Sequence, residues 1–210
     1  MKKMMVTLLA GAMLMMATSA MATSINGVLW TATGYNLSVH NLASISPTNT
    51  IGSFTVDQLN FDTRTYGDTY TKWLQGSSSN MNGLNWTSAA PSGFITDSNV
   101  ATFFQFTGTG YFAANTKITH DDGVVLWLTS PTSTSPTMYD FSYPTSPQES
   151  FLGNTAGVYN FVLNYAAWNG FPEVLEVNIA PVPEPGTMML LGIGLGGLAI
   201  FGKRRMNKEA

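Results

Sequence analysis

The segment FITDSNVATFFQFTGTGYFAANTKITHDDGVVLWLTS, residues 94–130, decides the fold, because its short runs of aromatic residues, threonine and valine are separated by Gly, Asn and Asp. Helical periodicity is nearly absent, and runs of this kind are typical of β-strands. Three strands are expected here, at residues 101–107, 110–119 and 124–129. Two more are expected after a loop, at residues 157–165 and 173–179. The sequence therefore predicts an all-β fold, an antiparallel β-sandwich of jelly-roll-like type.

The domain that carries these strands is expected to span residues 23–180, which is long enough for one domain with a substantial core. The chain contains no cysteine, so packing without disulfides must hold this core and thiol chemistry is excluded. Residues 76–93 are rich in Gly, Ser and Asn, and residues 130–137 in Pro, Ser and Thr. Both segments are expected to be surface loops.

Residues 1–22 have the three-part pattern of a secretory signal peptide. Two lysines precede an apolar run, and small residues with an A-x-A arrangement at residues 20–22 follow it. This N-terminal signal helix is expected to be removed, so the mature chain is expected to begin at Thr23.

The C-terminal region contains a second apolar segment. A linker at residues 181–186 carries the motif Pro183, Glu184 and Pro185, an uncharged stretch follows at residues 187–202, and a basic tail closes the chain at residues 203–210. As a helix the uncharged stretch is roughly 25 Å long, marginal for a hydrocarbon core of about 30 Å, although the following cations could snorkel. The stretch is therefore expected to be a transmembrane helix. The positive-inside tendency leaves the tail in the cytoplasm and the β-domain outside it.

The charges support this division of the chain. Six of the nine basic residues lie in the two end segments, while ten acidic residues lie between Thr23 and Ala180. The domain therefore carries a net of seven negative charges. Nucleic acid is not an expected partner, since neutralising phosphates requires clustered Lys and Arg.

The order Pro-Glu-Pro, glycine-rich apolar segment and Lys-Arg-Arg resembles the PEP-CTERM sorting signal of Gram-negative bacteria. The resemblance covers about residues 181–205. It implies that the protein is exported, recognised near Pro-Glu-Pro by an exosortase-type membrane peptidase, and released to the cell surface or into an extracellular matrix. The alternative is a permanent membrane anchor, which the same hydrophobicity permits.

Two adjacent carboxylates, Asp121 and Asp122, precede Gly123 at the entrance of a predicted strand. Like charges in contact cost free energy unless a cation or several amide donors compensate them. Oxygen ligands of this kind suit Ca²⁺ better than zinc. The alternative is an ordinary turn in which one carboxylate accepts backbone N–H bonds.

The segments GYFAANTKITHDDGVVLWL, residues 110–128, and AGVYNFVLNYAAWNGFPEVLEVNI, residues 156–179, resemble the protective-antigen-type domain, a β-sandwich of bacterial toxins, glycosidases and adhesins. In sugar-binding members an adjacent Asp pair holds calcium, and the metal helps to bind glycan hydroxyls. The resemblance implies that role for Asp121 and Asp122. The chain departs from the pattern at residues 126–136, where LWLTSPTSTSP replaces the common Asp-Gly turn.

Two further residues are candidate ligand-binding groups. Asn169 could supply an oxygen to a metal or a hydrogen bond to sugar, although Asn-Gly is also the sequence that a hairpin turn requires. Trp168 could stack on a sugar ring, or it could be partly buried packing. His120 and His40 have no spacing that indicates a zinc site.

Three classes of function follow from these features. The first is an exported surface or matrix protein with calcium-assisted binding of extracellular polysaccharide, and the second is a structural matrix or coat component that binds no ligand. The third is a glycoside hydrolase, for which Asp121 and Glu173 would have to face each other across a cleft. No Ser-His-Asp arrangement or phosphate loop is apparent, so the protein is not expected to be an enzyme.

Overall fold

The computed structural model describes residues 24–33, 42–48, 50–77, 82–87, 100–141, 146–168, 170–182, 192–195 and 197. The chain divides into two compact units, one formed by Thr23–Ala180 and the other by Met1–Ala22 together with Pro181–Ala210. In the second unit, residues 192–195 and 197 are helical. All the strands among the described residues belong to the first unit.

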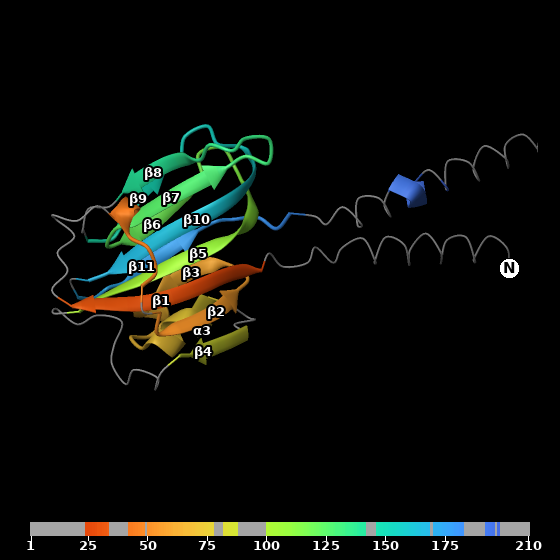
Figure 1. Cartoon of the computed structure of the whole chain (residues 1–210). Helices are drawn as coiled ribbons and strands as arrows, with labels where there is room; N and C mark the ends of the chain where they lie inside the picture. Colours follow the sequence, from red (N-terminus) through yellow and green to blue (C-terminus); the bar gives the residue numbers. More distant parts are fainter. Residues whose placement is uncertain are drawn as a thin grey trace, which may run out of the picture. The chain divides into compact units, whose positions relative to one another are not determined.

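The strands of the first unit form two antiparallel sheets (Figure 1). The seven-stranded sheet has the order β4 (Asn82–Trp86), β2 (Gly52–Val56), β1 (Ile25–Thr33), β5 (Val100–Phe112), β10 (Gly157–Ala167), β7 (Val124–Thr129) and β8 (Thr137–Phe141). The four-stranded sheet has the order β3 (Leu59–Asp62), β11 (Val174–Val177), β6 (Lys117–Asp121) and β9 (Gln148–Phe151). The predicted all-β class with antiparallel sheets is confirmed. The finer jelly-roll description stays a prediction.

The main core lies between the two sheets. Phe106 and Leu163 contribute from the large sheet, and Phe61 and Leu175 from the small one, all of them fully buried. Alternate residues of a strand point to opposite faces, so this core takes every second side chain of β3 and β11. The other positions of the small sheet face away from the core, and they become important below.

A second cluster covers part of the opposite face of the large sheet. Trp30 stacks on Phe103 with ring centroids 5.5 Å apart, and Leu42 from the 3₁₀ helix η1 (Leu42–Ser44) packs with them. The centre of this sheet is therefore buried on both faces. This explains why β7 reads as a nearly continuous apolar run rather than as an alternating one.

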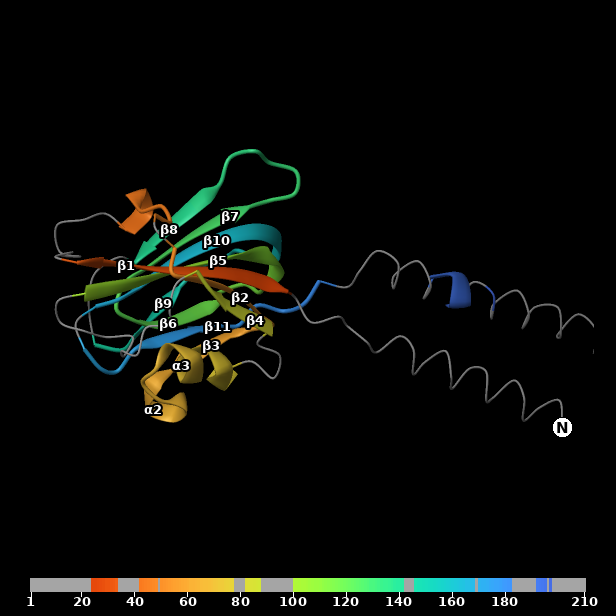
Figure 2. The ribbon, with the colours of Figure 1, turned by 60° about the horizontal axis from the view of Figure 1, so that its bottom comes forward.

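Two short helices, α2 (Thr63–Tyr66) and α3 (Tyr70–Ser77), follow β3 and lie beside the small sheet in Figure 2. The sequence analysis predicted neither helix. Trp73 of α3 is fully buried; it stacks on Phe61 with ring centroids 4.5 Å apart and packs at a tilt against Phe104 at 4.8 Å. The helix is held by this aromatic packing, since a segment of eight residues is too short to be stable by itself.

The predicted strand boundaries around residue 110 were wrong. Residues 101–107 and 110–112 belong to one long strand, β5, and a turn at residues 113–116 separates it from β6. The glycines interrupt the sequence pattern because neighbouring side chains need the space. A Cβ on Gly110 would lie 2.1 Å from Ile179 Cγ2, and one on Gly108 would lie 3.1 Å from the Phe161 ring. The actual turn contains Asn115 at φ 56°, a conformation that asparagine tolerates.

The predicted loops were partly right. Residues 130–136 connect β7 to β8 at the surface, and β8 begins at Thr137. The segment 76–93 was predicted as a loop throughout, but residues 82–86 form β4, which pairs with β2 at the edge of the large sheet. An edge strand pairs on one side only, so it can form from a sequence with weak strand propensity.

Candidate functional site

The topology brings two chain crossings together at one end of the sandwich. The chain passes from the small sheet to the large one between β6 and β7, and returns between β10 and β11. Because β7 pairs with β10 and β6 pairs with β11, both antiparallel, the two crossings must be neighbours. The first crossing contains Asp121 to Gly123 and the second contains Trp168. We call this place the crossing corner.

Hydrogen bonds join the two crossings directly. Asp122 Oδ2 accepts a hydrogen bond from the backbone N–H of Trp168 at 2.8 Å. The backbone N–H of Ala166 donates to Gly123 O at 3.0 Å. Two residues predicted separately from the sequence, Asp122 and Trp168, therefore belong to one site. β10 and β11 lie in different sheets, so the two strands do not pair as a hairpin.

The carboxylates at this corner are buried. Asp121 is 3% exposed, and Asp122 and Glu173 are 0% exposed. Tyr165, also fully buried, places its hydroxyl within hydrogen-bond distance of the Asp121 backbone carbonyl and, at 2.8 Å, of Glu173 Oε2. One hydroxyl hydrogen serves only one acceptor at a time. Both contacts are hydrogen bonds simultaneously when Glu173 is protonated and supplies the second hydrogen.

The pKa values of these groups follow from burial and from mutual repulsion. Burial and the neighbouring charge of Asp122 raise the pKa of Asp121 to about 7, although Arg64 opposes the shift. Burial and the charges of Asp122 and Asp121 raise the pKa of Glu173 well above its ordinary value. Glu173 Oε1 is buried and has no hydrogen-bond partner within the described residues. The corner thus holds more potential negative charge than its surroundings compensate.

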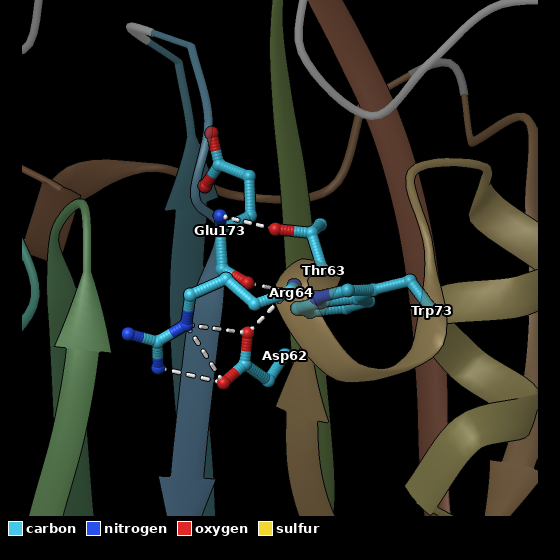
Figure 3. Close-up of polar contacts among 5 residues, drawn as sticks. All are labelled: Asp62, Thr63, Arg64, Trp73 and Glu173. Atoms are coloured by element: carbon cyan, nitrogen blue, oxygen red, sulfur yellow. Dashed lines mark hydrogen bonds and ion pairs between the residues drawn. The ribbon is translucent and has the colours of Figure 1, made fainter.

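The backbone of Glu173 is anchored from the opposite side by the segment that begins α2 (Figure 3). Its N–H donates to Thr63 Oγ1 at 2.9 Å, and its carbonyl accepts from the Thr63 N–H at 3.0 Å and from Trp73 Nε1 at 3.2 Å. The same helix start is capped by Asp62, which accepts from the Arg64 N–H at 2.8 Å. Figure 3 shows the Glu173 carboxylate pointing away from this cap.

Asp62 and Arg64 form an ion pair that is separate from the corner carboxylates. Arg64 Nη2 lies 2.6 Å from Asp62 Oδ2, and Arg64 Nε also donates to both carboxylate oxygens. Burial opposes ionisation of Asp62, but the hydrogen bonds from Arg64 outweigh it and hold the pKa of Asp62 below its ordinary value. Asp62 is therefore ionised and satisfied, unlike Asp121.

His120 is a structural residue of β6. Its Nδ1 lies 2.6 Å from the Asp122 carbonyl, which can only accept, so Nδ1 carries the hydrogen and Nε2 accepts from Ser150 Oγ at 3.0 Å. Burial lowers the pKa of His120, which keeps the ring neutral. The neutral imidazole helps to fix the backbone of the crossing corner.

The remaining predicted site residues lie outside the described residues. These are Asn169, next to Trp168, and the motif Pro183, Glu184 and Pro185. The sequence analysis considered Glu173 only as half of a catalytic pair and did not single out Tyr165. A buried glutamate has no local signature. The signal that could have found it is its place at the start of a predicted strand, directly after the segment that contains Trp168.

Two negative observations bear on the chemistry. Within the described residues, no group of three or more His, Asp or Glu side chains could hold a metal ion. The pair Asp121 and Glu173, which a glycosidase would need on two sides of a cleft, is instead buried in one cluster. A metal at the corner would thus need oxygen ligands beyond the described carboxylates.

No membrane-spanning helix is found in the part of the chain that the structure describes. The predicted transmembrane segment, residues 187–202, falls mostly outside that part, with the exception of residues 192–195 and 197.

Comparisons with known proteins give one motif and two similar structures. Residues 181–205 match the PEP-CTERM protein-sorting motif. The first similar structure is the PA14 domain of the antifreeze protein MpAFP, which has 15% sequence identity with this chain and a TM-score of 0.38. The match covers 75% of this chain and 81% of the MpAFP chain. The second is the PA14 sugar-binding domain from an RTX adhesin, which has 13% sequence identity with this chain and a TM-score of 0.40. The match covers 75% of this chain and 96% of the adhesin chain. No curated protein matches the sequence.

The PEP-CTERM signal predicted from the sequence is therefore confirmed, and this motif implies export that depends on an exosortase. Both similar structures are PA14 domains.

Proposed function

We propose that this chain is an exported, non-catalytic protein of the cell surface or extracellular matrix that binds carbohydrate with the help of calcium. Export rests on the PEP-CTERM motif at residues 181–205. The binding activity rests on one observation: the hydrogen bond from Trp168 N–H to Asp122 Oδ2 unites the predicted metal and ligand residues in one site.

In this proposal the apolar segment at residues 187–202 spans the membrane until an exosortase-type peptidase cuts near Pro183 to Pro185. The signal peptide is removed before Thr23. Intact mass and N-terminal sequencing of the exported protein test both cuts. The expected chain begins near Thr23 and lacks the residues after about Pro185. Exported protein that retains Lys203 to Ala210 would favour a permanent anchor instead.

Calcium fits the crossing corner by its donor chemistry. Asp121 and Asp122 would supply carboxylate oxygens, and Asn169 and backbone carbonyls of the two crossings would supply neutral oxygens, a mixture that Ca²⁺ accepts. Burial, and after it the neighbouring charge of Asp122, raise the pKa of Asp121 to about 7, a shift that a bound cation would oppose. A bound calcium would remove the repulsion between the two aspartates and offer a coordination point for vicinal sugar hydroxyls.

Trp168 and Asn169 are proposed to contact the sugar. Trp168 is half-buried and belongs to the return crossing, which the Asp122 carboxylate holds in place. The indole could pack against the apolar face of a pyranose ring, while the amide of Asn169 could bond a hydroxyl.

A glycan array run with calcium and with chelator tests this activity. Calcium-dependent binding that Asp122→Asn abolishes is the expected result. In the same buffers, calcium at one hundred times its Kd should stabilise the protein by about 2.7 kcal/mol, with magnesium a poorer substitute. Absence of any calcium effect on melting would make Asp121 to Gly123 an ordinary crossing turn.

A structural matrix component is the second candidate, and the burial of the corner favours it. Asp121 and Asp122 are 3% and 0% exposed, so a ligand would have to displace covering groups to reach them. A protein that binds no glycan on the array, yet is incorporated into the extracellular matrix, would support this alternative.

A further inference from the structure

The outward face of the small sheet carries a row of polar side chains. Glu176 of β11 pairs in register with Asn60 of β3 on one side and with Thr119 of β6 on the other. The flanking residues Leu175 and Val177 point into the core. Because side chains alternate along a strand, this row faces away from the core.

This face is hollowed into a groove of about 630 Å³. The polar row forms its floor, while the β5–β6 turn at residues 113–116 and Gln58 form walls. The volume lies within the range of about 300–1,000 Å³ that is usual for small-molecule sites. Neither Asp121 nor Asp122 lines the groove, so it is distinct from the crossing corner.

The lining combines neutral hydrogen-bonding groups with few charges. Side-chain amides of Gln58, Asn60 and Asn178 both donate and accept. Thr119 Oγ1 is shielded from solvent and has no hydrogen-bond partner within the described residues. The one lysine of the groove, Lys117, donates to Glu149 at 2.6 Å, outside the floor.

This chemistry matches a ligand whose groups also both donate and accept, as sugar hydroxyls do. The acidic balance of residues 23–180 disfavours a polyanion, and Glu176 in the floor adds to that repulsion. We propose that this groove binds a segment of neutral polysaccharide through Asn60, Glu176 and Asn178, independently of calcium. The inference does not depend on the crossing corner.

Isothermal titration of the exported protein in EDTA tests the groove. The probes are cellohexaose, chitohexaose and maltohexaose, with a hexamer of galacturonic acid as the anionic comparison. At least one neutral probe should bind, and the anionic one should not. Asn60→Ala and Glu176→Ala should each weaken binding about tenfold, which corresponds to about 1.4 kcal/mol. Asn178→Ala provides a variant outside any strand, should a strand variant fail to fold.

Asn26→Ala is the matched control, because Asn26 is an exposed amide on β1 of the other sheet. Its binding should stay within twofold of the unchanged protein. The proposal is overturned if no neutral probe binds at millimolar concentration, or if binding requires calcium. It is equally overturned if the groove variants bind like the control. Calcium-dependent binding that the groove variants leave intact would remove this proposal and leave the crossing corner standing.

Discussion

The buried Asp121 carboxylate should make the calcium-free protein less stable at pH 8 than at pH 5. Its pKa is about 7 in the folded protein against 3.8 as the ordinary value, so between these pH values the native state binds more protons than the unfolded state. Stability therefore falls as pH rises through this window and levels off above it. Over the whole titration the loss amounts to at most about 4 kcal/mol, of which roughly 2.7 kcal/mol falls between pH 5 and pH 8.

Asp121→Asn removes this ionisation while keeping the shape of the side chain and a donor toward Asp122. At pH 8 in EDTA, the variant should exceed the unchanged protein in free energy of unfolding by about 1–3 kcal/mol, part of the full difference. For a domain of this size, each kcal/mol moves Tm by about 2–4 °C. At pH 4 the two proteins should differ little, because the native carboxyl is then protonated.

Urea unfolding of the exported protein at pH 4, 5 and 8 measures these differences. Asp140→Asn, an exposed carboxylate on β8, controls for the general loss of one negative charge and should change stability by less than about 0.5 kcal/mol. Titrating groups away from the corner are shared by protein and variant, so the difference between them measures Asp121 together with the effect of its charge on Asp122 and Glu173. If Asp121→Asn is the less stable protein at pH 8 in EDTA, the repulsion argument fails. Added calcium should stabilise the unchanged protein but not this variant.

Substitutions of Glu173 and of Gly110 test the interior. In urea unfolding, Glu173→Gln should change the free energy of unfolding by less than about 1 kcal/mol, because the raised pKa keeps Glu173 protonated and glutamine has the same shape. Glu173→Ala should cost about 2–4 kcal/mol. Equal losses in the two variants would mean that the charge of Glu173 is needed. Gly110→Ala should lower stability by about 1–3 kcal/mol, since the new Cβ meets Ile179 Cγ2 at 2.1 Å. Combining it with Ile179→Ala should cost less than the sum of the single changes, and simple additivity would argue against this contact.

The sequence predicted those features that are local. The motif of Pro-Glu-Pro, an apolar stretch and a basic tail can be identified without knowing the tertiary structure. A membrane peptidase must recognise this segment while it is extended or bound in the membrane. The all-β class could likewise be predicted from runs such as residues 124–129, because aromatic and β-branched residues favour strands. The helix at Tyr70–Ser77 was missed because eight residues give too little periodicity, and its stability comes from the contacts of Trp73 with β3 and β5.

The sequence by itself determined that Asp121 and Asp122 repel each other, since adjacent residues are always close. Only the tertiary structure decided that Trp168 holds Asp122 and that Glu173 and Tyr165 complete the buried cluster. These residues meet because β6 pairs with β11 and β7 with β10, which forces both crossings to the same end of the sandwich. Pairing between residues more than thirty positions apart depends on packing of the whole core, so no local pattern encodes it.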